Sequence, residues 1–285
     1  MRTKSAVCMF IAAAIAGAML SSCGAPENTV HSVDDLKGKT IGVQIGTTGD
    51  TLAGDIEDGK VEKYNKYSDA VQALKQGKVD AVIIDKDTAD VFVGKNSDVQ
   101  LLDEGFADES YAIAINLDNA ELQTQINGAL AELDKEGTLK AIKDSYDGEE
   151  KGERYRSPEN ADRSKGTLVM ATNAEFPPYE SREGDEFVGI DVDMMNAVCD
   201  KLGYQLKIDD MAFDSVIPAV QSHKADVGVA GLSVTEDRKK NVLFSDEYTV
   251  THLVVMVRKD KYGTLYLNNS RGRAISAPVL FDIMK

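Results

Sequence analysis

The chain contains no tryptophan and only three histidines and three cysteines in 285 residues. The histidines, His31, His223 and His252, are scattered and lack the spacing of metal ligands. No phosphate-binding P-loop and no nucleophile motif of the G-x-S-x-G type occurs. We therefore expect no metal ion and no cofactor.

Positive charge is also scarce. The 32 lysines and arginines are outnumbered by 48 aspartates and glutamates, so the formal net charge is −16 at pH 7. A surface of this sign repels phosphates, and nucleic acid is therefore not expected as a partner. The charge is still compatible with a small ligand held in a local pocket.

The N-terminus predicts export. Arg2 and Lys4 precede the uncharged, mostly apolar run Ala6–Leu20, which is too short for an ordinary membrane span and typical of a signal peptide. Residues 20–24, Leu-Ser-Ser-Cys-Gly, resemble the lipobox of bacterial lipoproteins. We expect an extracytoplasmic protein that is anchored to the cell membrane by a lipid on Cys23, with plain secretion as the alternative.

The cysteines do not predict a disulfide. Cys8 belongs to the signal segment and Cys23 is expected to be acylated, which leaves Cys199 without a partner. Cys199 lies on the apolar face of a predicted helix. We therefore expect it to be a core residue.

Two stretches of the sequence alternate between strand and helix patterns, which is typical of an α/β protein. Gly137 and Gly203 each mark the end of a predicted helix. Between the two stretches, residues 149–165 are almost all charged or polar, which predicts a flexible linker. The predicted strands are 40–45, 79–84, 111–115, 167–172, 225–229 and 251–257, and the predicted helices are 68–76, 120–133, 138–146, 191–202 and 216–221.

Polar groups follow several of these strands, and open α/β sheets bind ligands beyond the carboxyl ends of their strands. The first strand is followed by Gly46-Thr47-Thr48-Gly49-Asp50, which lets a ligand approach the backbone but also suits an ordinary turn. Asp85 follows the second strand, where it can meet a cation or cap the next helix. Arg238 comes soon after strand 225–229 and can hold a carboxylate, although a solvated helix position is the alternative.

Aromatic residues from two other loops are further candidates for ligand contacts. Residues 173–179, Asn-Ala-Glu-Phe-Pro-Pro-Tyr, present Phe176, and Phe213 precedes another helix; core packing is the alternative for both rings. The combined groups suit a small zwitterion, with its carboxylate on Arg238 and its ammonium on Asp85. No nucleophile–base pair and no pair of catalytic acids is evident, so we do not expect an enzyme.

Taken together, these segments resemble the bacterial extracytoplasmic solute-binding proteins of family 3, the receptors for polar amino acids in ABC uptake systems. The resemblance implies an α/β, two-lobed periplasmic-binding-protein-like fold of type II, with the ligand cleft between the lobes. The matching runs are 173–179, 187–193, 217–221, 226–238 and 244–248, together with 35–43, 46–48, 77–82 and 133–146.

The resemblance also implies which residues contact the common part of an amino acid. It places Arg238 on the ligand carboxylate, helped by Thr48 and Ser233 or their backbone N–H groups. It places Asp85 on the ligand ammonium, with the backbone of Gly231 nearby.

The ligand side chain is expected to lie between Phe176 and Phe213. Two positions depart from the family pattern. Asn173 stands where aspartate is common, and Gln44 stands where some members use a cation or another residue that reads the tail of the ligand. The resemblance therefore leaves the bound amino acid open.

The order of the segments differs from that of the family, whose members run from the first lobe to the second and back. This chain begins in the second lobe and contains each segment once, which we interpret as a circular permutation. Residues 261–285 resemble nothing in the family. The expected divisions are 1–22 signal peptide, 23–33 lipid-anchor tether, 34–110 lobe 2, 111–148 C-terminal part of lobe 1, 149–165 linker, 166–250 N-terminal part of lobe 1, 251–260 crossover strand to lobe 2, and 261–285 unassigned tail.

The expected function is that of a monomeric, lipid-anchored binding protein that captures an amino acid in the cleft and delivers it to an ABC permease. Two alternatives stay open. One is a non-functional or chain-swapped product of a rearranged gene, and the other, less favoured, is a dehydratase-like enzyme on the same scaffold. A protein that is insensitive to ligand, or that is only dimeric, would favour the first alternative, and turnover of a bound ligand would favour the second.

Overall fold

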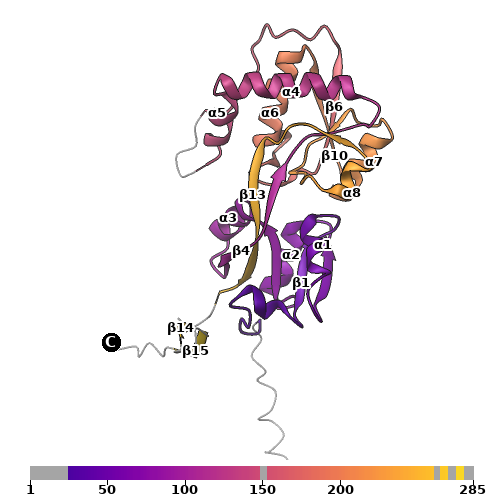
Figure 1. The fold of residues 1–285 in the computed structure, drawn as a ribbon. Helices are drawn as coiled ribbons and strands as arrows, with labels where there is room; N and C mark the ends of the chain where they lie inside the picture. Colours follow the sequence, from indigo (N-terminus) through magenta and orange to yellow (C-terminus); the bar gives the residue numbers. More distant parts are fainter. Residues whose placement is uncertain (1–24, 148–152, 260–263, 269–273, 279–285) are drawn as a thin grey trace, which may run out of the picture.

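The computed structural model describes residues 25–147, 153–259, 264–268 and 274–278. Two five-stranded sheets, each packed with helices, form two lobes that are joined by two long strands (Figure 1). The predicted two-lobed α/β fold is confirmed. The predicted signal peptide and Cys23 lie outside the described residues, and no helix within them is long and apolar enough to span a bilayer.

Lobe A contains a sheet with the strand order β2-β1-β3-β13-β4. Strands β1, β2 and β3 run parallel, whereas β13 is antiparallel to both β3 and β4. Every residue of β3 is buried, as expected for an inner strand covered on both faces. The elements of this lobe are η1 (Val33–Leu36), β1 (Thr40–Gln44), α1 (Thr48–Ala53), β2 (Lys60–Tyr64), α2 (Tyr67–Lys75), β3 (Ala81–Asp85), α3 (Lys86–Lys95), β4 (Val99–Tyr111) and β13 (Thr249–Arg258).

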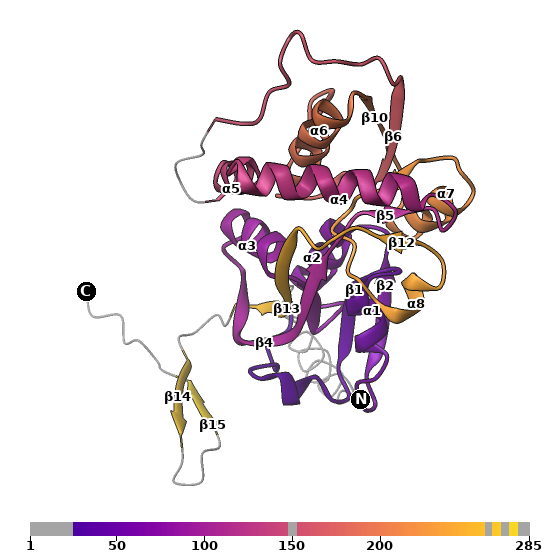
Figure 2. The same ribbon diagram turned by 45° about the horizontal axis from the view of Figure 1, so that its top comes forward.

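Lobe B contains a sheet with the order β10-β6-β11-β5-β12 and a small sheet β7-β8-β9. Its longest helix, α4, lies across the lobe (Figure 2) and buries one apolar face. The helices are α4 (Ala120–Lys135), α5 (Thr138–Asp144), α6 (Ile190–Leu202), η2 (Phe213–Ser215), α7 (Val216–Gln221) and α8 (Glu236–Lys239). The strands are β5 (Ala114–Ile115), β6 (Thr167–Thr172), β7 (Glu175–Phe176), β8 (Glu180–Glu183), β9 (Glu186–Val188), β10 (Gln205–Asp210), β11 (Val227–Gly228) and β12 (Leu243–Phe244).

The two halves of the chain exchange strands. β5, from the first half, lies between β11 and β12 of the second half. β13, from the second half, lies between β3 and β4 of the first half. Each sheet is therefore completed by an inner strand from the other half, and the chain crosses between lobes after β4 and again after β12.

Several sequence predictions hold at the level of single elements. β6 and α7 begin and end where they were predicted, and Gly137 and Gly203 adopt the left-handed conformation at helix ends, with φ of 78° and 86°. Cys199 is a buried core residue, as expected. The predicted strand 111–115 is instead divided, because the chain changes lobes between β4 and β5.

The segment predicted as a flexible linker makes specific contacts over its described part, residues 153–165. It has no helix or strand, but the Tyr155 hydroxyl donates to Asp200 of α6 at 2.8 Å, and Arg163 forms an ion pair with the same carboxylate. The Lys165 N–H donates to the Gly203 carbonyl at 3.0 Å. This segment is therefore pinned along α6.

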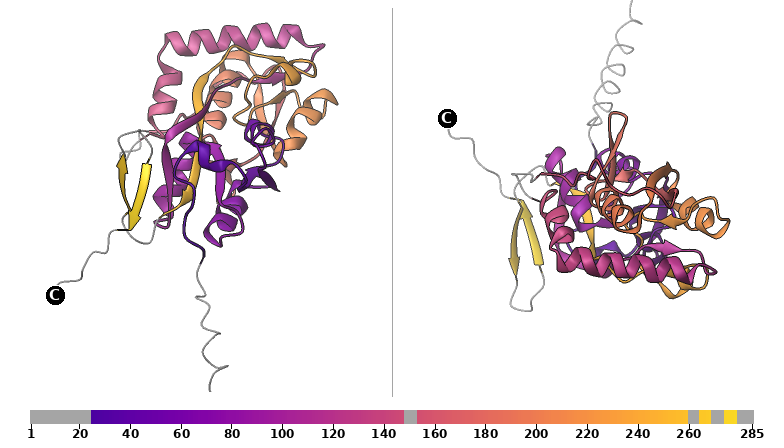
Figure 3. Two further views of the ribbon diagram at one scale, coloured as in Figure 1. Left: turned by 60° about the horizontal axis from the view of Figure 1, so that its bottom comes forward. Right: turned by 90° about the horizontal axis from the view of Figure 1, so that it is seen from above.

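The expected unassigned tail contains two further strands. β14 (Thr264–Asn268) and β15 (Ala274–Pro278) pair with each other in antiparallel fashion. The hairpin lies outside both lobes (Figure 3).

Candidate functional site

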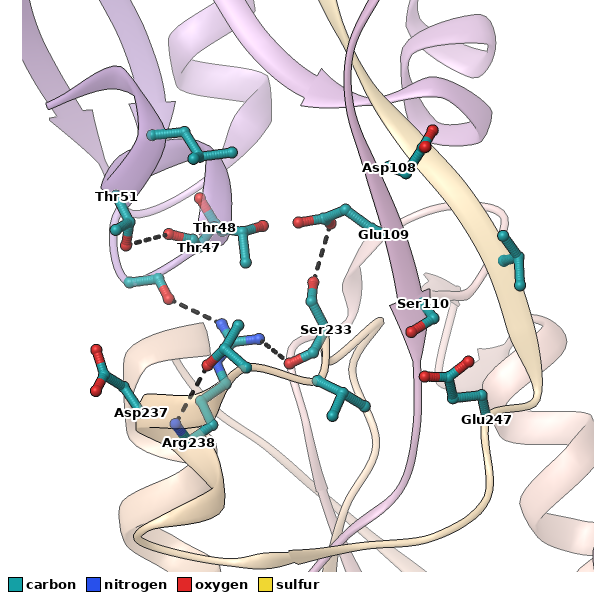
Figure 4. A pocket seen from close by; sticks show the side chains of 15 residues that line it. Thr47, Thr48, Thr51, Asp108, Glu109, Ser110, Ser233, Asp237, Arg238 and Glu247 are labelled. Atoms are coloured by element: carbon teal, nitrogen blue, oxygen red, sulfur yellow. Dashed lines mark hydrogen bonds between the residues drawn. The ribbon is translucent and has the colours of Figure 1, made fainter. Parts of the chain in front are cut away.

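A small pocket lies between the lobes, at the ends of β1 and β3 and beside the loop that follows β11. We call it the inner pocket; its free space is about 10 Å³, enough for about one water molecule. It opens next to an outer pocket of about 590 Å³ (Figure 4). The inner pocket is lined by Gln44, Thr47, Thr48, Tyr67, Asp85 and Glu109 from lobe A, and by Phe176, Phe213, Ala230, Gly231, Ser233 and Arg238 from lobe B.

Arg238 connects the two lobes. Its side chain leaves the short helix α8, and its guanidinium donates to the Ser233 carbonyl at 2.8 Å and to the Gly46 carbonyl of lobe A at 3.1 Å. The guanidinium carbon lies 5.6 Å from the centre of the Phe213 ring. Burial lowers the pKa of Arg238, but an arginine starts so high that it stays charged. The arrangement fixes one positive charge at the boundary between the lobes.

Asp85 supplies a buried carboxylate at the end of β3. It stands at the N-cap position of α3 but makes no capping hydrogen bond; its oxygen instead accepts from the Tyr111 hydroxyl. Burial, and then the negative charge of Glu109, raise the pKa of Asp85 well above its usual value. A cation placed beside Asp85 would favour its charged form.

Glu109 is a second carboxylate in the inner pocket, and it was not among the predicted ligand-binding residues. It lies on β4 and accepts a hydrogen bond from the Ser233 hydroxyl at 2.9 Å (Figure 4). Tyr67 also lines the pocket and was not predicted. Glu109 was not selected from the sequence because it lies within β4, whereas the predicted site residues were sought beyond the ends of strands.

Phe176 and Gly231 pack directly against each other. The Phe176 ring is buried among Tyr67, Tyr111 and Tyr179, with ring centres 6.0, 6.5 and 5.6 Å away. Gly231 has a φ of 54°, and a Cβ atom there would lie 2.6 Å from Phe176 Cε1. Phe176 is thus both a core residue and a wall of the pocket, and Gly231 is required where the loop passes over it.

Gln44 and Asn173 meet across the lobes. The Gln44 amide Nε2 donates to Asn173 Oδ1 and to the Asn65 carbonyl, each at 2.9 Å. Gln44 lines the inner pocket, whereas Asn173 does not; of the predicted ligand-binding residues, Asn173 alone is absent from the lining. Thr48, the first residue of α1, faces both pockets.

The pocket brings together groups of opposite charge. It presents one guanidinium, two carboxylates and several hydroxyls between two lobes that are joined by two strands. Within the described residues, no group of three histidine, cysteine, aspartate or glutamate side chains could hold a metal ion. These features define a two-lobed ligand-binding protein.

The sequence comparison identifies the family. Residues 168–274 match the profile of the bacterial extracellular solute-binding proteins, family 3. The match continues past residue 260, so the expectation that residues 261–285 resemble nothing in the family is corrected for its first part. The matched segment, about a third of the chain, is therefore similar to proteins that bind solutes outside the cytoplasm.

Relatives whose names state a ligand align with part of this chain. The arginine-binding extracellular protein ArtP of Bacillus subtilis (strain 168) is 35% identical over 42% of the chain and 46% of its own length. The L-cystine-binding protein TcyJ of Escherichia coli (strain K12) is 32% identical over 43% of the chain and 47% of its own length. The chain therefore spans about half the length of these relatives. The arginine-bound form of domain 1 from TmArgBP is 39% identical over 34% of this chain and 82% of that one, with a TM-score of 0.29.

Proposed function

We propose that this protein binds a free amino acid in the inner pocket. The carboxylate of the ligand pairs with Arg238, its ammonium pairs with Asp85, and its side chain lies between Phe176 and Phe213. The observation that carries the proposal is the placement of a guanidinium and a buried carboxylate in one pocket lined by both lobes. Such a pocket matches the two opposite charges of an α-amino acid.

The remaining predicted residues complete this arrangement. Thr48 and Ser233 offer hydroxyls or backbone N–H groups to the ligand carboxylate, and the backbone of Gly231 lies beside the ammonium. A ligand carboxylate would replace the Ser233 and Gly46 carbonyls as partners of Arg238. An ionised partner forms a stronger hydrogen bond than a neutral carbonyl, which favours the exchange.

The charge of the pocket favours a cationic amino acid. Asp85 and Glu109 bring two carboxylates, whereas Arg238 brings one guanidinium. A zwitterion adds no net charge, but a basic side chain adds the missing positive charge. Arginine is therefore our first candidate, in keeping with the arginine-binding relatives, although cystine-binding and histidine-binding proteins also match.

Ligand entry requires movement of the lobes. The inner pocket has space for about one water molecule, which is much less than an amino acid needs. We propose that the lobes separate by bending where β4 and β13 leave lobe A, and close again on the ligand. The Arg238–Gly46 and Gln44–Asn173 bonds must break when they open.

The cellular role follows from the expected N-terminus. We propose that residues 1–22 are a signal peptide, that Cys23 carries a lipid, and that the protein delivers its amino acid to an ABC permease as a monomer. We also propose that the chain is a circular permutation with the lobe boundaries given above. The exchange of β5 and β13 between the two halves of the chain supports this interpretation.

The first test is thermal unfolding of residues 24–285 in the presence of each of the twenty amino acids. At 100 times its dissociation constant, a ligand adds about 2.7 kcal/mol of stability. For a protein of this size the melting temperature then rises by roughly 5–10 °C. A cooperative melt that no amino acid moves would contradict the proposal.

The second test compares two arginines that each lie over a phenylalanine ring. Arg238→Ala should weaken binding by at least about 100-fold in calorimetry, because the ligand carboxylate loses its charged partner. Arg182, 4.1 Å from the Phe187 ring centre and paired with Asp210, lies outside the pocket and serves as the control. Arg182→Ala should leave affinity within about threefold of the original. Equal losses in both variants would remove the carboxylate assignment.

A further inference from the structure

Asp191 connects two distant segments of lobe B. It lies in the first turn of α6 and is 0% exposed. Its Oδ2 atom accepts from the Gly231 N–H at 3.0 Å and from the Tyr248 hydroxyl at 2.9 Å. One partner belongs to the loop that lines the inner pocket, and the other belongs to the connection that leads into β13.

The bond to Gly231 bears on the site itself. Gly231 is held between Asp191 and the Phe176 ring, so the path of the loop is fixed at that residue. Two residues later, the Ser233 carbonyl accepts from Arg238 and the Ser233 hydroxyl donates to Glu109. A displacement of Gly231 would therefore move the groups that hold Arg238.

The bond to Tyr248 bears on the crossing strands. The Tyr248 backbone N–H donates to the Tyr111 carbonyl at 3.0 Å, where β4 ends. The rings of the two tyrosines are 6.5 Å apart, and the Tyr111 hydroxyl donates to Asp85. Asp191 is therefore linked, through hydrogen bonds of Tyr248, to the place where β4 and β13 pass between the lobes.

Glu180 accompanies Asp191 and is also 0% exposed. Within the described residues, neither Glu180 oxygen nor Asp191 Oδ1 has a hydrogen-bond donor. Burial, and then the negative charge of Asp191, raise the pKa of Glu180 well above its usual value, which favours a proton on this carboxyl group. The other titratable groups that act on the pair are Tyr248, Tyr179, Asp85 and Asp210.

We infer that Asp191, through its hydrogen bonds to Gly231 and Tyr248, is a positioning residue that ties the pocket loop to the crossing strand. It does not touch the ligand. Its effect on affinity rests on the proposed function, but the coupling of the two segments does not. A variant that removes the Asp191 acceptor should loosen both segments together.

The test uses Asp191→Ala and Asp191→Asn, with Asp193→Ala as the matched control. Asn keeps an oxygen for Gly231 and Tyr248 and adds a donor for Glu180, so it should preserve the arrangement. Asp193 is buried on the same helix and accepts from Tyr146 at 2.8 Å, but it does not contact the pocket loop. Tyr248→Phe removes one of the two bonds and serves if Asp191→Ala does not fold.

The primary readout is amide hydrogen exchange, which needs no ligand. In Asp191→Ala, exchange in segments 229–234 and 246–250 should accelerate together by at least about tenfold. Asp191→Asn and Asp193→Ala should leave both segments within about threefold of the original. Tyr248→Phe should accelerate exchange in both segments to a smaller extent. Unchanged protection in Asp191→Ala, or in Tyr248→Phe if it is the variant that folds, would overturn the inference, as would equal acceleration in Asp193→Ala.

The second readout is the affinity for arginine. Asp191→Ala should weaken binding by at least about tenfold, and Asp191→Asn should restore it. Affinity that is unchanged in Asp191→Ala would overturn the positioning role. If the original chain binds no amino acid while exchange responds as expected, the proposed function fails and the coupling through Asp191 stands.

Discussion

Gln44 in lobe A donates a buried hydrogen bond of 2.9 Å to Asn173 Oδ1 in lobe B. The other end of the Asn173 amide donates to the Met211 carbonyl at 2.8 Å, so the orientation of this side chain is fixed from both sides. The pair joins the two lobes beside the inner pocket through neutral groups. Asparagine is specifically suited to this position, because it must both accept and donate.

Asn173→Asp should therefore destabilise the protein, although the two side chains have the same shape. The aspartate loses the donor to Met211 and places a carboxylate against a carbonyl oxygen. We expect a loss of about 1–3 kcal/mol in urea unfolding at pH 7. Asn196→Asp is the control, because its amide donates to the Val192 carbonyl at 3.0 Å within one helix and away from the pocket. A smaller loss for Asn173→Asp than for the control would contradict the expectation.

Gly231→Ala should cost more than the same change at a turn with a similar backbone. The new Cβ would lie 2.6 Å from Phe176 Cε1, and the surrounding aromatic rings leave Phe176 little room to move. We expect a loss of about 2–4 kcal/mol, combining left-handed strain with overpacking. Gly184→Ala has a φ of 64° and open space around it, so it measures the strain alone at about 1–2 kcal/mol. Equal melting temperatures for the two variants would show that Phe176 moves freely.

The stability of the protein should depend on Asp191 between pH 4 and 6. Burial raises the pKa of Asp191 to about 6, whereas an unfolded aspartate titrates near 3.9. The folded state therefore holds a proton that the unfolded state has released, so the Asp191 contribution to stability falls as pH rises through this range and is level above it. Asp191→Asn cannot titrate. Its stability relative to the original chain should grow from pH 4 to about 6 and then stay constant, which urea unfolding at a series of pH values measures. A difference that is the same at every pH would refute the assignment.

The segment 153–165 should become sensitive to proteases when its anchors are removed. Tyr155→Phe removes the hydrogen bond to Asp200, and Arg163→Ala removes the ion pair to the same carboxylate. We expect faster cleavage within the segment and no change in amino-acid affinity, because no residue of the segment or of α6 lines the inner pocket. Arg156→Ala, at an exposed position of the same segment, is the control and should cleave at the original rate. No acceleration in either anchor variant would mean that other contacts hold the segment.

The bounds of helices and strands were predicted best where the residues of the element itself determine its structure. β6 and α7 have clear apolar patterns, and glycines end the helices at Gly137 and Gly203, so their bounds follow from local chemistry. β4 was missed over most of its length, because its sequence contains Asp103, Glu104 and Gly105 and becomes a strand through pairing with β13.

Site residues, like helices and strands, were predictable where their position depends on nearby sequence and not where it depends on distant pairing. Groups at the ends of predicted strands, such as Asp85, Ser233 and Arg238, could be proposed from the sequence because parallel strands present their ends at one edge. Glu109 could not, because its position depends on a strand that the sequence did not reveal. The Gln44–Asn173 contact is also beyond prediction, since it depends on how the two lobes face each other.

The exchange of inner strands has a consequence for synthesis. While the first half of the chain is complete and the second is still being made, β3 has no partner on the side that β13 will occupy. Such an open strand edge, apolar in four of its five residues, invites pairing with other chains. The risk lasts until residues 249–258 emerge, so factors that keep the nascent chain unfolded during that interval should raise the yield of folded protein.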